Sequence, residues 1–270
     1  GTEGARTPTG QMNIRAAYRK GVGAAGTIEA GQLSQAMDRP QGLKGVTNPD
    51  PASGGADPDS ADSARTSAPL HVLTLERAVS LEDYQNYALA FAGIAKALAT
   101  WTWVGRTRGV FLTVAGAYGT VFEPDDPTMT NLIKALRSAG NPHIPLTAAS
   151  YTPVLFEIGA NVRVDRDNYD PTRVLAQVWQ SLATSLGFNQ RQPGQGVAQS
   201  EIVALMQSTP GVIAVELTTF KRQGQLVLPG SPLPAVLRAA APLPGQHGTP
   251  HGAEMLLLDP ASQGSLEVWS

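Results

Sequence analysis

Glycine and proline set the first limit on what this chain can fold into. Its 270 residues include 28 glycines and 21 prolines, well above the usual combined share of about one residue in eight. Proline interrupts helices and central strands, and glycine permits the backbone angles of tight turns. The sequence therefore predicts an α+β protein made of short elements joined by many turns.

The first 70 residues predict a β/turn-rich segment. Glycines and prolines recur from Gly21 to Gly55 without apolar periodicity, so short strands joined by tight turns fit better than helices. The dipeptide Asp57-Pro58 is the exception. Aspartate as N-cap followed by proline at the first helical position favours the start of a short helix.

Residues 71–150 predict a first α+β unit. Ser80 and Asp83 have the spacing of a capping box at the start of a helix. A strand pair follows over 94–103 and 110–115, and a second helix is expected to end at Gly140. The apolar stripes of the two helices are Tyr84, Tyr87, Ala88 and Phe91, and Met129, Leu132, Ile133 and Leu136.

Residues 151–222 predict a second α+β unit. Every other residue from Phe156 to Val164 is apolar, the period of a strand with one buried face. Asp170-Pro171 favours the start of a helix, and Pro210-Gly211 separates a further helix from a strand. The apolar positions of these elements are Val174, Leu175, Val178, Trp179, Leu182 and Leu186, then Ile202, Leu205 and Met206, then Ile213, Val215 and Leu217.

The two units echo each other weakly. The echo consists of a helix, a turn of small residues and a strand, and either a duplication or a common supersecondary pattern explains it. The alignment pairs Gly93 with Gly211, Tyr84 with Ile202, Tyr87 with Leu205, Ala88 with Met206 and Ile94 with Val212.

Residues 223–270 predict a Pro-rich extended tail, either exposed or bound to a partner. Two apolar islands, at 255–258 and 266–269, interrupt it. They fit two interpretations equally well. They are docking strands for a partner, or strands that pack on the chain's own body.

Charge and apolar content exclude several partners. A net charge of −2 and a pI near 6.1 give no general attraction to nucleic acid or to an anionic membrane. No apolar run approaches the ~18 residues of a membrane helix, and residues 1–10 lack signal-peptide features, so we expect cytoplasmic synthesis without membrane insertion. Only 16% of residues are charged, which favours surfaces that neighbouring subunits cover.

Candidate sites for chemistry have simpler explanations. Gly21, Gly23 and Gly26 spell a dinucleotide fingerprint, but glycine and proline soon interrupt the helix that it requires. Ser53 lacks the sequence context of a nucleophile elbow. There are no cysteines, and two aspartate clusters that superficially resemble calcium loops lack the required glycine and glutamate. We therefore predict no enzyme activity, no cofactor and no metal site.

Five segments, in order, are similar to motifs of one known family, at 18–28, 46–57, 75–84, 91–97 and 201–215. The second closely resembles the signature Asn-Pro-x-Pro-Ala-x-Gly-Gly-x-Asp, and the third resembles Arg-Ala-Val-Thr-x-x-Asp-Tyr. The family is that of baseplate J-like, or baseplate assembly, proteins of contractile phages and extracellular injection systems. Thr27 and Asp50 depart from its pattern, and the tail has no counterpart in it. Because family members are usually longer at the N-terminus, we expect an upstream region to be missing.

The resemblance implies a structural wedge subunit of a phage-tail-like particle. Its partners would be copies of itself, a second wedge protein, the hub and spike, and sheath-proximal baseplate proteins. The contact residues that we predict lie in the signature loops and in the apolar islands of the tail. They are Tyr18, Arg19, Lys20, Asn48, Pro49, Pro51 and Asp57, and Met255, Leu257 and Trp269.

Two other functions compete with this one. A tail-associated carbohydrate- or receptor-binding module would place clustered aromatics on its surface, whereas most aromatics here fall on expected core faces. A hydrolase would need a convergent polar site, and the sequence shows no such constellation.

Overall fold

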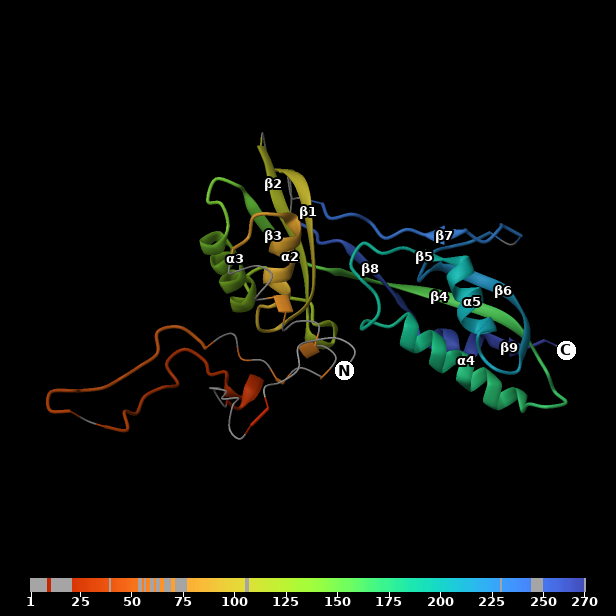
Figure 1. Cartoon of the computed structure of the whole chain (residues 1–270), viewed down its shortest axis with the longest axis horizontal. Helices are drawn as coiled ribbons and strands as arrows, with labels where there is room; N and C mark the ends of the chain where they lie inside the picture. Colours follow the sequence, from red (N-terminus) through yellow and green to blue (C-terminus); the bar gives the residue numbers. More distant parts are fainter. Residues whose placement is uncertain are drawn as a thin grey trace. The chain divides into compact units, whose positions relative to one another are not determined.

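The computed structural model divides the chain after Pro58 into two units, residues 1–58 and 59–270, drawn in Figure 1. The described residues are 9–10, 21–38, 40–52, 55, 57–58, 61, 64–65, 69–70, 77–104, 107–228, 230–243 and 250–269. Their helices are η1 (Gly23–Gly26), α2 (Leu81–Leu89), η2 (Ala117–Gly119), α3 (Pro127–Ala139), α4 (Pro171–Ser185), α5 (Gln199–Gln207) and η3 (Pro260–Ser265). Their strands are β1 (Ile94–Val104), β2 (Thr107–Gly116), β3 (Leu146–Ser150), β4 (Thr152–Val164), β5 (Val197–Ala198), β6 (Val212–Arg222), β7 (Val236–Leu237), β8 (Glu254–Leu258) and β9 (Leu266–Val268).

The described residues of the first unit form the expected turns but none of the expected strands. Within the described residues 21–38 and 40–52, the backbone forms turns, bends and η1, and no strand. Side-chain hydrogen bonds hold these loops in place of a strand ladder, as detailed below. The short helix expected after Asp57-Pro58 falls largely outside the described residues.

The first sheet of the second unit has the order β1-β2-β3. β1 and β2 form the expected antiparallel pair, and β3 returns parallel to β2 after α3. Helices α2 and α3 pack on one face, as Figure 1 shows, and their buried side chains include Tyr84 and Leu132. Ser80 and Asp83 form the expected capping box of α2, and α3 ends at Gly140 as expected. Local sequence signals therefore place these helix ends correctly.

The second sheet is built around β4. β6 pairs antiparallel with β4 on one side, while β8 and β9 pair parallel with it on the other. All five apolar positions of the expected alternation from Phe156 to Val164 are buried, and the side chains of α4 and α5 complete this core. Asp170 accepts a hydrogen bond from Thr172 N at 3.0 Å and caps α4 as predicted.

The Pro-rich tail is part of this second body rather than an extended appendage. β7 pairs with β5, and β8 and β9 complete the sheet around β4. Both apolar islands form strands that pack on the chain's own body, which was one of the two interpretations. The prolines leave short stretches of the tail free to pair as strands, and Pro260 begins the short helix η3.

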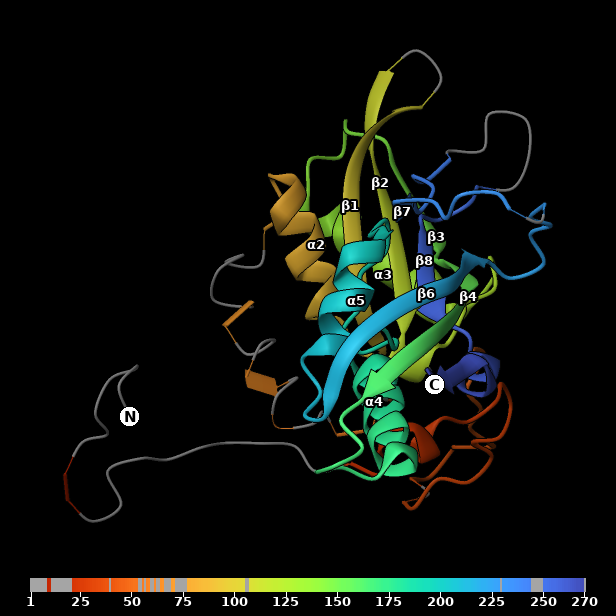
Figure 2. The ribbon, with the colours of Figure 1, turned by 90° about the vertical axis from the view of Figure 1, so that its right-hand side faces the viewer.

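The expected echo, between α2–β1 and α5–β6 of the second unit, is present in the backbone. α2 and α5 have nine residues each, and β1 and β6 have eleven each. The turn glycines, Gly93 and Gly211, have φ angles of +87° and +92°. Each strand also has a register shift after its first residue, which leaves Ala95 and Ile213 as the extra residues. In Figure 2, α5 can be followed through its turn into β6.

The two sheets are joined within the second unit. Tyr151 N donates to Val114 O of the first sheet, and the next residue, Thr152, donates its N–H to Ala253 O beside β8. Thr113 Oγ1 accepts from Ala253 N at 3.0 Å. The chain therefore passes from β3 into β4 with hydrogen bonds to both sheets.

Candidate protein–protein interface

Asn48, a predicted contact residue, is an internal brace of the first unit. Its side chain accepts from Leu33 N and donates to Glu29 O and Asp50 O, each at 2.9 Å. In addition, the backbone N–H of Gly31 donates a hydrogen bond to the backbone carbonyl oxygen of Asn48 at 2.9 Å. Because these bonds use the side-chain oxygen and both amide hydrogens, Asn48 shapes the signature loop.

The neighbouring signature residues are exposed. Pro49, Pro51 and Asp57 all present their side chains to solvent, while Tyr18, Arg19 and Lys20 lie outside the described residues. A Cβ added at Gly55 would come within 3.0 Å of Gly23 O, so the two glycine-rich segments approach closely. Glycine is therefore needed at Gly55 for this contact between loops.

The described part of the first unit lacks a hydrophobic core. Among the described residues, the buried apolar side chains all belong to Ala78 or later positions. Large apolar side chains of the first unit are instead more than a third exposed, at Val22, Leu33, Met37, Leu43 and Val46. Exposed apolar groups gathered in one segment are typical of a surface that another protein covers.

The C-terminal candidates fall into two groups. Met255 is fully buried and packs with Ala115 and Tyr151, with half-buried Leu257 against the same cluster. A contact role for Met255 is therefore corrected, because the chain itself already covers this side chain. Trp269 remains 43% exposed, while its backbone N–H donates to Val162 O at 2.8 Å. A contact role for Leu257 and Trp269 stays a prediction.

Sequence reasoning missed one exposed aromatic pair. Trp101 and Trp103 lie two positions apart on β1, on the same face of the strand, and both are exposed. A strand of eleven residues is about 36 Å long, whereas a nine-residue helix is about 14 Å long. This difference was available in the sequence, and it indicates that α2 is too short to cover all of β1.

Buried cations connect the two sheets and brace the second. Lys96 Nζ donates to Asn189 O at 3.0 Å and lies 5.2 Å from the centre of the Phe188 ring. Burial lowers the pKa of Lys96. Arg191 is almost fully buried, and it donates to Glu201 and to the carbonyl oxygens of Gln195 and Gly196. Both cations therefore have structural partners.

A second polar tie anchors the tail. Arg222 forms a bidentate pair with Glu254, at 3.0 and 2.7 Å. The hydrogen bonds of this pair raise the pKa of Arg222 and lower that of Glu254. Ala240 N also donates to Glu254 at 2.7 Å, so the carboxylate holds the end of β6 and the returning tail together.

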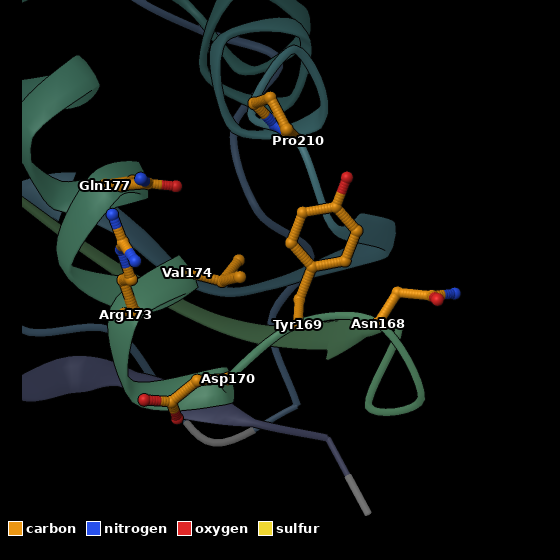
Figure 3. A pocket seen from close by; sticks show the side chains of 7 residues that line it. All are labelled: Asn168, Tyr169, Asp170, Arg173, Val174, Gln177 and Pro210. Atoms are coloured by element: carbon orange, nitrogen blue, oxygen red, sulfur yellow. The ribbon is translucent and has the colours of Figure 1, made fainter.

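One surface pocket of about 320 Å³ lies at the start of α4. Figure 3 shows Tyr169 between Pro210 and the helix, with Arg173 and Gln177 on the helix itself. The Asp170 carboxylate at its edge caps α4. Helix capping thus accounts for the one acidic side chain of this pocket.

Two classes of site are not seen in the described part of the chain. There, no group of three or more His, Cys, Asp or Glu side chains is placed to hold a metal ion. None of its helices combines the length and the apolar character that a membrane crossing requires.

Comparisons with known proteins find a family model that is similar to the first sheet and its helices. Residues 76–149 match the family described as Baseplate J-like central domain. A search of curated proteins finds no match. Among solved structures, the chain resembles one from the cryo-EM structure of the anti-feeding prophage baseplate, with 13% identity and a TM-score of 0.45. That match covers 84% of this chain, which spans about half (48%) of the solved one.

The family match extends from before α2 into β3. It includes the capping box of α2 and the β1–β2 hairpin, and it overlaps two of the five segments that resemble the family, at 75–84 and 91–97. The resemblance to the baseplate J-like family is therefore confirmed, through the match of residues 76–149 to its central domain.

Proposed function

We propose that this chain is a structural, non-catalytic subunit of the baseplate of a phage-tail-like contractile injection machine. The match of residues 76–149 to the Baseplate J-like central domain carries the proposal. Within the baseplate we assign the chain to the wedge, next to the hub and spike. Its neighbours there are copies of itself, a second wedge protein and sheath-proximal proteins. It is made in the cytoplasm and becomes part of the particle.

The first unit supports an assembly role. Its described residues expose large apolar side chains and bury none, so burial of apolar area contributes little to its own stability. A partner surface would supply the burial that the segment lacks. Asn48 and Gly55 fix the shape of the loops that such a partner would meet.

The test is incorporation into particles. An epitope-tagged chain is expressed in a cell that makes the particles, and the lysate is separated by sedimentation. We expect the tag in the fast-sedimenting particle fraction and, in micrographs, at the baseplate end. A tag found only in the slow fraction, beside complete untagged particles, would overturn the proposal.

A variant sharpens this test. Asn48→Ala removes three hydrogen bonds from the signature loop while leaving the cores of the second unit unchanged. We expect reduced incorporation into particles with an unchanged unfolding midpoint of the second unit. Thr172→Ala, an exposed change on α4, is the matched control.

A carbohydrate- or receptor-binding module remains the second candidate, because Trp101 and Trp103 form an exposed aromatic pair. Such pairs stack on sugar rings and on peptides alike. Glycan binding that quenches tryptophan fluorescence would favour this function.

A further inference from the structure

The second unit consists of two lobes with separate cores. The first-sheet lobe, residues 77–150, buries apolar side chains between its sheet and helices α2 and α3. The second-sheet lobe, residues 152–269, buries another set around β4. Among the helices and strands that the structure describes, every extensive contact between elements lies within one lobe. Two cores with little contact between them are typical of domains that move relative to each other.

The described part of the chain passes between the lobes once, at Tyr151. The backbone N–H of Tyr151 donates to Val114 O of the first-sheet lobe, whereas the next N–H, of Thr152, donates to Ala253 O of the second-sheet lobe. The hydrogen bonds therefore change lobes between two consecutive residues. A backbone rotation at this point reorients the lobes while both sheets keep their strand pairing, which is how a hinge works.

The apolar contact between the lobes is small. It consists of three buried side chains and two half-buried ones, far fewer than either core contains. A hydrogen bond crosses it from Ala253 N to Thr113 Oγ1 at 3.0 Å. A limited contact of this kind holds two lobes together without fixing them. Its members are Ala115 of the first-sheet lobe, Tyr151 at the crossing, and Met255, Phe188 and Leu257 of the second-sheet lobe.

Lys96 places a positive charge in this contact. It lies opposite Ala115 of the apolar cluster in the β1–β2 ladder, and only 7% of its surface is exposed. Its Nζ donates to Asn189 O of the second-sheet lobe at 3.0 Å and lies over the Phe188 ring. Asn189 O accepts one of the three hydrogens that an ammonium group can donate.

Burial of this charge opposes closure of the lobes. An ammonium group loses its hydration in an apolar contact, and burial lowers the pKa of Lys96. The Asn189 carbonyl and the Phe188 ring return part of that loss. An apolar side chain of similar volume would carry no such cost, because replacing a buried charge in this way is often neutral or stabilising. Lys96 therefore weakens a contact that apolar burial alone would favour.

We propose that the two lobes open and close about Tyr151, and that Lys96 keeps the closed contact reversible. In the open state, the ammonium group of Lys96 returns to water and Ala253 N separates from Thr113. In the closed state, the apolar cluster offsets the cost of burying the charge. The inference goes beyond the proposed function, because the motion belongs to a single chain and needs no partner.

Amide hydrogen exchange of the full chain, followed by NMR, measures the opening. The amide of Ala253 reports it, because its acceptor lies on the other lobe. The amides of Leu132 in α3 and Leu182 in α4, whose side chains are fully buried, report unfolding of each lobe. We expect the Ala253 amide to have a protection factor at least about tenfold lower than both, since local opening costs less than unfolding.

The variant Lys96→Met distinguishes this role from a structural tie. Methionine fills a similar volume without a charge, so opening should become about tenfold rarer, and the Ala253 protection factor should rise by the same factor. A lysine that merely tied the lobes together would give the opposite result on removal. Lys134→Met removes the same charge from the exposed surface of α3 and should leave the protection factors of these amides unchanged.

Phe188→Ala should act in the opposite direction. It removes apolar area from the contact between the lobes, and Phe188 belongs to neither core. The Ala253 protection factor should therefore fall, while those of Leu132 and Leu182 should not.

A distance measurement separates opening of the lobes from fraying of the tail. Spin labels are attached at Arg137→Cys on α3 and Gln180→Cys on α4, both exposed positions, and the natural sequence has no cysteine that would compete for the label. We expect a second label-to-label distance in Phe188→Ala, and less of it when Lys96→Met is added.

Three results would each contradict the hinge. A wild-type Ala253 protection factor equal to those of Leu132 and Leu182 would mean that the lobes separate only when they unfold. An unchanged or lower Ala253 protection factor in Lys96→Met would remove the proposed role of the charge. A single label-to-label distance in Phe188→Ala would assign the exchange at Ala253 to the tail alone.

Discussion

The two helix–turn–strand segments, α2–β1 and α5–β6, have almost the same backbone but are held in different ways. Both helices end one turn before a glycine with a positive φ angle, and both strands have a bulge at their second residue. Their sequences have little in common. Geometry of this kind is therefore compatible with more than one set of stabilising contacts.

The difference is clearest where each helix begins. α2 begins with a capping box, in which Ser80 and Asp83 bind each other's backbone N–H groups. α5 begins at Gln199, and its N-cap residue, Ala198, gives no side-chain hydrogen bond. There, Gln199 N donates to Ala235 O of the tail, and Glu201 pairs with buried Arg191. One start is stabilised by residues within four positions, and the other by residues that are distant in the sequence.

The largest expected effect tests the core of the second segment. Ile202→Ala removes a fully buried side chain of α5, and substitutions of this kind cost about 3 kcal/mol in the free energy of unfolding. Ile213→Ala, at the exposed bulge, should cost under about 0.5 kcal/mol. Urea denaturation measures both. Similar losses for the two variants would show that α5 does not hold the core as described.

The two turn glycines should differ in their tolerance of a side chain. Both positive φ angles disfavour alanine by about 1 kcal/mol. A Cβ at Gly211 would also lie 2.7 Å from the Tyr169 ring, whereas one at Gly93 would meet only Thr128 at 3.5 Å. We expect Gly211→Ala to cost about 2 kcal/mol and Gly93→Ala about 1 kcal/mol.

Removing Tyr169 should abolish that difference. The variant Gly211→Ala with Tyr169→Ala is compared with Tyr169→Ala alone by thermal unfolding. The cost of the added methyl group should fall to the Gly93→Ala value. If the cost of Gly211→Ala stayed the same without Tyr169, the whole cost would come from the backbone angle and none from the contact with the ring.

The capping box of α2 should contribute less to stability than the Ile202 side chain or the glycine at position 211. Ser80→Ala removes the oxygen that accepts from Asp83 N, and the loss of an N-cap costs about 1 kcal/mol. Ala198→Ser, at the start of α5, is the matched change. We expect little gain from it, because the tail already binds Gln199 N. If Ala198→Ser raised the urea midpoint by the equivalent of about 1 kcal/mol, this account of α5 would be contradicted.

The smallest effect is the pH dependence of the same cap. Hydrogen bonds from the backbone of Ser80 and Val79 lower the pKa of Asp83 below its model-peptide value of 3.8. A lowered pKa stabilises the fold above the unfolded value, and this contribution is lost as pH falls through the folded value. The stability difference between wild type and Asp83→Asn should therefore shrink as pH falls from 5 to below 3.8. A constant difference would exclude the charge of Asp83 from the cap.

Local signals made much of the second unit predictable. The Ser80–Asp83 box, the Asp170-Pro171 start and the alternation along β4 all depend on residues a few positions apart. The tail strands were expected, but their pairing could not be predicted in the same way, because Glu254 of β8 pairs with Thr152 of β4. No periodicity in the Pro-rich tail specifies that partner.

The interface was less predictable for a related reason. The signature around Asn48 was recognised, but its bracing role depends on Leu33, which is 15 residues away. Met255 looked like a docking residue because the sequence does not show that Ala115 and Tyr151 cover it. The exposure of Trp101 and Trp103 depends also on where α2 lies along β1, which only the assembled sheet makes plain.

The central claim is that other protein subunits cover the exposed apolar surfaces of this chain. It can be tested by cysteine labelling, since the natural sequence has no cysteine. Single variants Met37→Cys and Leu228→Cys are labelled with a maleimide in the free chain, in purified particles, and in particles dissociated by denaturant. We predict rapid labelling in the free chain, labelling at least about tenfold slower in particles, and recovery on dissociation. Equal labelling rates in the free chain and in particles would contradict the account.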